Sequence, residues 1–117
     1  MQGLNIVIVE DYIERIKKFR RKLIGNNVVI TKNPKEAIDL LRTEPIDVLF
    51  LDHDLGGTGQ PEPSGPGTGY EVAKWLEENP EFQPNQIIIH SLNPVGQKNM
   101  KAALPTARVI PAVWDQL

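Results

Sequence analysis

Three short runs of apolar residues most constrain the fold of this chain. Residues 4–9, 47–51 and 87–89 are apolar almost throughout and lack the alternation with polar residues that marks a half-buried strand. Such runs are typical of strands buried on both faces, as in a parallel sheet covered by helices. Residues 28–30 and 109–110 are candidates for two further strands.

Helical patterns fill the segments between these strands. Apolar residues recur at three- and four-residue spacing in 12–24, which predicts one amphipathic helix. Three more helices are expected to begin at residues with capping or first-turn preferences, namely Asn33-Pro34, Thr68 or Gly69, and Asn93-Pro94. Strands and helices therefore alternate along the chain.

This alternation predicts an α/β fold with a five-stranded parallel sheet in the flavodoxin-like order 2-1-3-4-5. The 117 residues suffice for one domain, 1–117, because single cores usually hold about 50 to 250 residues. The last expected strand lies so close to Leu117 that the final helix of such a fold should be missing or truncated.

Glycine and proline concentrate in the loop 56–69, which holds six of the nine glycines and three of the ten prolines. A segment of this composition is expected to form neither helix nor strand and to be mobile. Long loops of this kind are often lids or binding loops, although a tolerated surface insertion is the alternative.

Charge and composition exclude several classes of protein. The net charge is −2, so a general nucleic-acid coat is disfavoured, and we expect no duplex-DNA-binding motif. The absence of cysteine excludes disulfides, thiolate zinc sites and a catalytic thiol. No apolar run approaches the roughly 20 residues that cross a bilayer, so we expect a cytoplasmic protein without membrane contact.

Reactive side chains collect where three of the strands end. In open parallel sheets, ligands bind beyond the carboxyl ends of the strands, where the strand order reverses. The residues at these ends are Glu10-Asp11 after the first strand, Asp52-His53-Asp54 after the third, and His90-Ser91 after the fourth. Both histidines and the densest acidic cluster therefore meet at one edge, where we expect the functional site.

The carboxylates at this edge have two interpretations. Glu10, Asp11 and Asp52 offer the oxygen ligands that Mg²⁺ prefers, together with water and a substrate phosphate. Alternatively, Asp11 heads the first helix, where an acidic residue interacts favourably with the helix dipole.

The two histidines favour acid–base chemistry, because the pKa of imidazole lies near working pH. Strand parity places Asp52 and Asp54 on one face and His53 on the other. The same rule separates His90 from Ser91. These placements allow His53 to meet His90, and a separate subsite would join Asp52 to Ser91. The alternative is that each histidine is structural and held by a hydrogen bond.

Residues 91–96 open the fourth helix with a possible anion site. Free backbone N–H groups at a helix start bind anions, and Gly96 would allow a ligand to come close, so Ser91, Asn93 and Gly96 are candidate substrate-binding residues. The six basic residues of 11–25 could steer a phosphorylated ligand, or could simply form a solvated face.

These residues resemble a receiver domain of the response-regulator type over nearly the whole chain. The resemblance implies that Glu10-Asp11 is the acidic metal-binding pair, that Asp52 is the phospho-acceptor and that Ser91 is the switch residue. Ile110-Pro111 replaces the Lys-Pro pair that receivers carry after the fifth strand.

Three motifs are more specifically similar to the cyclic-phosphate-processing receiver-like family. They are residues 51–56 (LDHDLG), 68–73 (TGYEVA) and 89–96 (IHSLNPVG). The resemblance implies action on cyclic phosphates of nucleotides or RNA ends, with His53 and His90 in the active site beside Asp52, Asp54 and Ser91.

The leading hypothesis is therefore a cyclic phosphodiester hydrolase whose catalytic residues are His53, His90 and Asp54. One histidine would take a proton from water while the other protonates the leaving oxygen. The alternative is a non-catalytic, degenerate receiver that serves as a signalling or protein-binding module. A working phospho-receiver is a third possibility, which the missing lysine disfavours.

Overall fold

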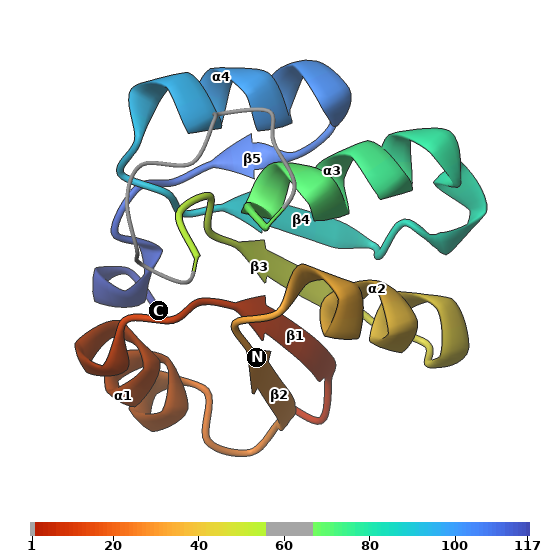
Figure 1. Ribbon diagram of the computed structural model, residues 1–117. Helices are drawn as coiled ribbons and strands as arrows, with labels where there is room; N and C mark the ends of the chain where they lie inside the picture. Colours follow the sequence, from red (N-terminus) through yellow and green to blue (C-terminus); the bar gives the residue numbers. More distant parts are fainter. Residues whose placement is uncertain (1, 56–66) are drawn as a thin grey trace.

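A computed structural model describes residues 2–55 and 67–117 and has the predicted α/β architecture (Figure 1). Five parallel strands form one sheet in the order β2-β1-β3-β4-β5, so the predicted strand order is confirmed. The strands are β1 (Asn5–Val9), β2 (Asn27–Thr31), β3 (Val48–Leu51), β4 (Gln86–Ile89) and β5 (Arg108–Val109).

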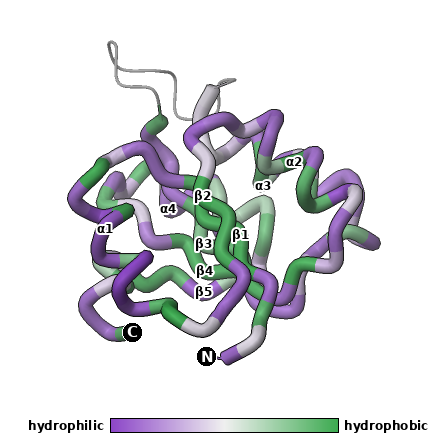
Figure 2. The backbone as a smooth tube through the Cα atoms, turned by 90° about the horizontal axis from the view of Figure 1, so that it is seen from below, coloured by the Kyte–Doolittle hydropathy of each residue, from purple (hydrophilic) through white to green (hydrophobic). Residues whose placement is uncertain are grey.

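The register of the three central strands decides which side chains share a face. Ile8 of β1 lies beside Phe50 of β3, and Phe50 lies beside Ile88 of β4. Because side chains alternate between faces, even-numbered residues of these strands point to one face and odd-numbered residues to the other. Both faces are apolar, and Figure 2 shows the strands as a mostly hydrophobic centre between more hydrophilic helices.

Three helices pack with the odd-numbered face. They are α2 (Pro34–Thr43), α3 (Gly69–Glu78) and α4 (Pro94–Ala103). Each begins at a predicted cap, because the side chains of Asn33, Thr68 and Asn93 accept hydrogen bonds from backbone N–H groups of the first turn. A short 3-10 turn, η1 (Pro80–Phe82), follows α3.

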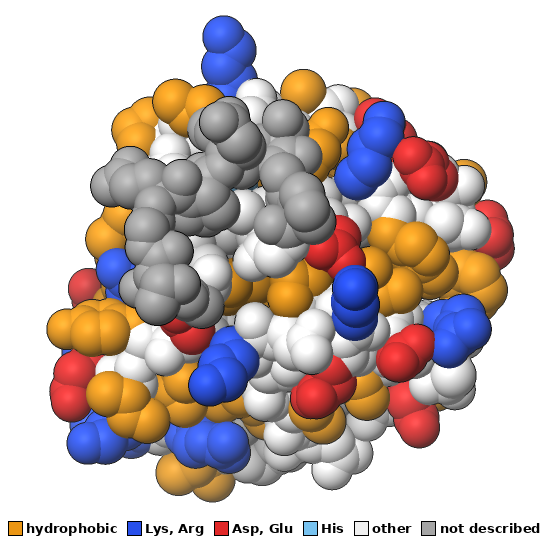
Figure 3. Space-filling model, in the orientation of Figure 1, with side chains coloured by type: hydrophobic (Ala, Val, Ile, Leu, Met, Phe, Trp, Pro, Cys, Tyr) orange, Lys and Arg blue, Asp and Glu red, His pale blue; other side chains and the backbone are white. Residues whose placement is uncertain are grey.

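The even-numbered face is covered by α1 (Ile13–Lys22) and by a C-terminal 3-10 turn, η2 (Val113–Asp115). The turn stands where a final helix was expected to be missing or truncated, and its Trp114 takes over part of the covering. The ring of Phe19 lies 5.2 Å from that of Phe50 and 5.9 Å from that of Trp114. Lys and Arg side chains gather on the outer surface over α1 (Figure 3).

The structure bears on two further expectations from the sequence, one about the glycine- and proline-rich loop and one about membrane spans. Most of the glycine- and proline-rich loop, residues 56–66, lies outside the described residues, whereas Thr68 caps α3 and Gly69 is its first residue. Among the described residues, no helix has the length and apolar character that a membrane span requires.

Replacing Phe19 by alanine should lower the free energy of unfolding by about 3–5 kcal/mol, because Phe19 is fully buried among three rings of the even-numbered face. Urea denaturation of the purified protein measures this loss. The matched control is Ile24→Ala, at an exposed position near the end of the same helix, which should change stability by no more than about 0.5 kcal/mol. Equal effects of the two substitutions would contradict the assignment of Phe19 to the core.

Candidate functional site

The parallel hydrogen-bond ladder continues one residue beyond the ends of β1, β3 and β4. The N–H groups of Glu10, Asp52 and His90 donate to the carbonyl oxygens of the neighbouring strands at 3.0, 3.0 and 3.1 Å. The register that aligns Ile8, Phe50 and Ile88 therefore also aligns these three residues, two positions later on the same face. We call Glu10, Asp52 and His90 the edge row.

The edge row is a compact, buried group of polar side chains. Each of the three residues is at most 3% exposed. Nε2 of His90 lies 3.0 Å from Oε1 of Glu10. One ligand atom from each residue can be chosen so that all three lie within 4.8 Å of one another. Two acids and an imidazole thus share a small volume at the carboxyl edge of the sheet.

Arg15 of α1 supplies positive charge to this row. Its Nη1 lies 3.7 Å from Oε1 of Glu10 and 3.9 Å from Oδ2 of Asp52. The guanidinium also lies over two aromatic rings, 5.1 Å from the centre of Trp114 and 5.2 Å from that of Tyr12. With 24% of its side chain exposed, Arg15 links the buried row to the surface.

Burial and charge determine the protonation of the row. Burial raises the pKa of Asp52 to about 8, and the nearby charge of Glu10 adds to the rise. Burial alone would also raise the pKa of Glu10, but hydrogen bonds from His90 and from the N–H of Tyr12, together with Arg15, hold that pKa below its usual value. The row therefore carries one ionised acid, Glu10, beside a largely neutral one.

His90 is neutral in this environment. Burial lowers the pKa of its imidazole and outweighs the opposing effect of Glu10. Because ionised Glu10 only accepts hydrogen bonds, Nε2 of His90 carries the proton and donates it to Oε1. Nδ1 is buried and has no hydrogen-bond partner among the described residues. The ring is held instead by Phe19 and Trp114, whose centres lie 5.1 and 5.8 Å away.

His53 lies on the opposite face of the sheet, so the expected meeting of His53 with His90 was wrong. The ring of His53 packs under α4, where a Cβ atom added to Gly96 would come within 2.4 Å of its Cγ. The error came from the register, because Asp52, not His53, is the residue aligned with His90. For the same reason Asp52 and Ser91 do not form the second subsite that parity allowed.

Asp54 connects His53 to the start of α4. Its Oδ1 accepts a hydrogen bond from Nδ1 of His53 at 2.9 Å and one from Nδ2 of Asn93 at 3.2 Å. Because the carboxylate accepts both, Nδ1 of His53 carries the proton. This chain of contacts ties the end of β3 to the cap of α4, which is a structural arrangement. A catalytic role for His53, Asp54 and His90 remains a prediction from sequence.

The residues expected to bind a substrate anion already have protein partners. The N–H of Gly96 donates to Oδ1 of Asn93 at 3.1 Å, and the N–H of Asn93 donates to Oγ of Ser91 at 3.0 Å. Gly96 allows the His53 ring, and not a ligand, to come close. The start of α4 is thus capped from within, and substrate binding by Ser91, Asn93 and Gly96 stays a prediction.

The predicted magnesium site is only partly reproduced. Glu10 and Asp52 lie together, but the third member of the potential ligand group among residues 2–55 and 67–117 is His90 and not Asp11. Mg²⁺ prefers oxygen ligands, whereas imidazole suits zinc, iron and copper. The donor set of the edge row therefore does not fit Mg²⁺ well.

Sequence reasoning missed Arg15 and Trp114. Arg15 is the first of six basic residues, and the pattern gave no sign that it alone turns toward the acidic edge. One signal was available: the first turn of this helix follows the Glu10-Asp11 pair directly, so a basic residue there starts near the carboxylates. Trp114 had no comparable signal.

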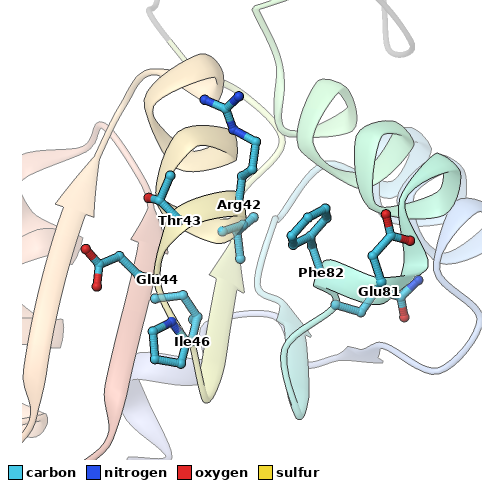
Figure 4. A pocket seen from close by; sticks show the side chains of 9 residues that line it. Arg42, Thr43, Glu44, Ile46, Glu81 and Phe82 are labelled. Carbon is cyan, nitrogen blue, oxygen red and sulfur yellow. The ribbon is translucent and has the colours of Figure 1, made fainter.

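A pocket of about 360 Å³ lies at the other end of the sheet, remote from the edge row. It is formed by the end of α2, the segment between α2 and β3, and η1 with the residue after it, and Arg42 and Phe82 are among its lining residues (Figure 4). These segments precede β3 and β4, so the pocket faces the amino ends of the strands. It is therefore separate from the candidate site.

Comparison with known proteins identifies relatives of this chain. Residues 6–106 match the family described as the cyclic-phosphate processing receiver domain. The polar-differentiation response regulator DivK of Brucella anthropi is 34% identical over 86 residues, which is 72% of this chain and 63% of DivK. The match thus spans less than two-thirds of that relative's length.

Solved structures of response regulators share the fold. The phosphorylated cyanobacterial phytochrome response regulator RcpA matches with a TM-score of 0.73 at 19% identity, over 98% of this chain and 86% of RcpA. A response regulator from Thermotoga maritima matches with a TM-score of 0.60 at 20% identity, over 97% of this chain and 90% of the regulator.

Replacing Asp52 by asparagine should remove a pH-dependent loss of stability. An aspartate in the unfolded chain has a pKa of about 3.9, whereas the pKa of Asp52 in the folded protein is about 8. Between these values the folded state keeps a proton that the unfolded state releases. The contribution of Asp52 to the free energy of unfolding is therefore fully present below about pH 4. It falls by up to about 1.4 kcal/mol per pH unit as the pH rises toward 8.

Urea denaturation in the presence of a chelator, from pH 5 to pH 8, measures this effect as the difference between Asp52→Asn and the wild type. The variant should gain on the wild type as the pH rises. Asp39→Asn, the same substitution at an exposed position of α2, is the control and should show no such gain. A difference between Asp52→Asn and the wild type that stays constant with pH would show that Asp52 is ionised throughout.

Proposed function

Since this chain belongs to the cyclic-phosphate processing receiver domain family, and is a receiver domain of the response-regulator type, we propose that it serves as a non-catalytic signalling module that binds a protein partner. The observation that carries the proposal is the separation of the two histidines. His53 lies under α4, while His90 lies on the face covered by α1.

Two-histidine hydrolysis requires both imidazoles to reach one phosphodiester. A general base and a general acid each need to come within about 2.6–3.2 Å of the atom that they serve, directly or through one water. Two rings on opposite faces of a sheet do not meet this condition. Each ring is also buried and paired with its own carboxylate, His53 with Asp54 and His90 with Glu10.

Phosphorylation of Asp52 by the usual receiver mechanism is also disfavoured. Ile110 replaces the lysine that the receiver resemblance places after the fifth strand. In the metal-free protein, a carboxyl group with a pKa of about 8 is mostly protonated at neutral pH and is then a poor nucleophile. We therefore favour signalling through partner binding over signalling through a phosphoryl group.

The rim of the candidate site has the properties of a partner surface. The starts of α1 and α4 lie at the carboxyl edge, on opposite faces of the sheet. Each has two exposed large apolar side chains in or just before its first turn, Tyr12 and Ile13 at α1 and Leu92 and Val95 at α4. Exposed apolar side chains with charged surroundings are a common feature of protein interfaces. The basic outer surface of α1 adds a preference for an acidic partner.

A second candidate function is cyclic-phosphate processing at the edge row itself. The observation that favours it is the position of Arg15, a cation suited to phosphate, next to Glu10, Asp52 and His90. In this version His90 takes part in the chemistry, while His53 supports α4. The substrate would be a cyclic phosphate of a nucleotide or of an RNA end.

Turnover of 2′,3′-cyclic AMP distinguishes these functions. We expect the wild type to open no cyclic phosphate, with Mg²⁺ or with Mn²⁺, when product is followed by chromatography. Turnover that is lost in both His53→Ala and His90→Ala would restore the two-histidine enzyme. Turnover that is lost in His90→Ala and Asp52→Asn but survives in His53→Ala would favour the second candidate. Circular dichroism of each variant confirms that it is folded.

Photo-crosslinking in cells tests the partner surface. A photoreactive amino acid placed at Tyr12 or Val95, which are 54% and 52% exposed, should give a discrete adduct with one other protein. The matched control is Val29, which is 42% exposed on β2 and away from the rim, and should give no such adduct. An adduct of equal yield at Val29, or none at either rim position, would overturn the proposed surface.

A further inference from the structure

We propose that Glu10, Asp52 and His90 bind one divalent transition-metal ion, such as Zn²⁺, in preference to the Mg²⁺ that the receiver fold implies. The inference concerns the metal preference of the edge row. It does not depend on whether the domain acts as a signalling module or as an enzyme.

The chemistry of the donors supports this preference. Two carboxylates and one imidazole form a ligand set that suits zinc and iron, whereas Mg²⁺ takes oxygen ligands with several waters. The three ligand atoms lie within 4.8 Å of one another. Two ligands on opposite sides of such an ion are at most about 4.2 Å apart, so small side-chain rotations bring the row to binding distance.

The backbone holds these donors in place. The three residues extend adjacent strands, and each is fixed by its own ladder hydrogen bond. Their side chains therefore converge from a rigid sheet, and little ordering is needed when an ion binds. All three are buried, so an ion among them would be shielded from bulk water.

The imidazole of His90 is a buried nitrogen ligand that is able to change its tautomer. Nε2 points at Glu10 and carries the proton in the metal-free protein. Nδ1 has no partner among the described residues, so no donor competes for its lone pair. A proton moved to Nδ1 lacks a protein acceptor, and the metal–nitrogen bond must outweigh that cost. The shift leaves a lone pair on Nε2 directed into the row. His53, by contrast, is held in one tautomer by Asp54.

Arg15 occupies the electrostatic role of the ion in the metal-free protein. Its Nη1 lies 3.7 and 3.9 Å from the two carboxylates, which is an ion-pair distance without a short hydrogen bond. A divalent cation would repel the guanidinium. Arg15 already lies over Tyr12 and Trp114, so these rings offer it a position when it leaves the carboxylates.

Isothermal titration of the chelator-treated protein with Zn²⁺ and Mg²⁺ tests the proposal. We expect one Zn²⁺ per chain, bound about tenfold or more tightly than Mg²⁺. Asp52→Asn and His90→Gln should each weaken Zn²⁺ binding by at least about 10–100-fold. That is the loss seen when a residue that only supports a metal ligand is removed. Arg15→Gln should tighten binding by about tenfold, because it removes a competing positive charge.

Asp39→Asn, the same change of charge at an exposed position of α2, is the matched control and should bind like the wild type. Binding that Asp39→Asn weakens as much as Asp52→Asn does would indicate an adventitious surface ion only. Mg²⁺ bound as tightly as Zn²⁺ would overturn the proposal, and so would unchanged Zn²⁺ binding by a folded His90→Gln variant.

Two measurements avoid substitutions in the row, in case those variants do not fold. In ¹⁵N NMR of the wild type, Zn²⁺ should shift the ring nitrogens of His90 and leave those of His53 in place. In Trp75→Phe, where Trp114 is the remaining tryptophan, metal should change the fluorescence as Arg15 moves against the indole. Metal binding without a shift at His90 would exclude it as a ligand.

Discussion

The register of the parallel sheet, which puts the even-numbered residues of β1, β3 and β4 on one face, is the constraint on which the rest of this structure depends. It places Ile8, Phe50 and Ile88 in one line across three strands, and the ladder carries that line two residues further. The side chains of Glu10, Asp52 and His90 therefore all lie on the even-numbered face of the sheet. A shift of one strand by a single residue would move its polar end residue to the other side of the sheet.

Much of the fold could be predicted from local patterns, because each pattern has a local physical cause. Uninterrupted apolar runs marked the central strands, and Asn33, Thr68 and Asn93 cap the helices that they were expected to begin. The site was predicted less well, because pairing between strands depends on contacts between distant segments. Parity separated Asp52 from His53 correctly, but it was wrong for Asp54, which lies beside His53 at the start of α4 because β3 ends at Leu51. The alignment of His90 with Asp52 could not be read from either strand alone.

The same distinction explains the residues that were missed. Arg15 belongs to a helix with several basic residues, and it shares the sheet-facing side of that helix with Phe19, one turn further on, so tertiary packing brings it beside the acids. The receiver resemblance predicts a lysine after the last strand, at the position that Ile110 occupies. The positive charge comes instead from Arg15 of α1. A helix, and not the end of the last strand, therefore supplies the cation beside the two buried acids.

One helix therefore serves both the hydrophobic interior and the charged edge. Phe19 and Arg15 project from α1 one turn apart, and the indole of Trp114 contacts the side chains of both. A displacement of the Arg15 guanidinium therefore changes its contact with the Trp114 ring, which also covers the hydrophobic core of the even-numbered face. The C-terminal turn is thus coupled to the edge row through Arg15, and its ordering should depend on the charge of Glu10 and Asp52.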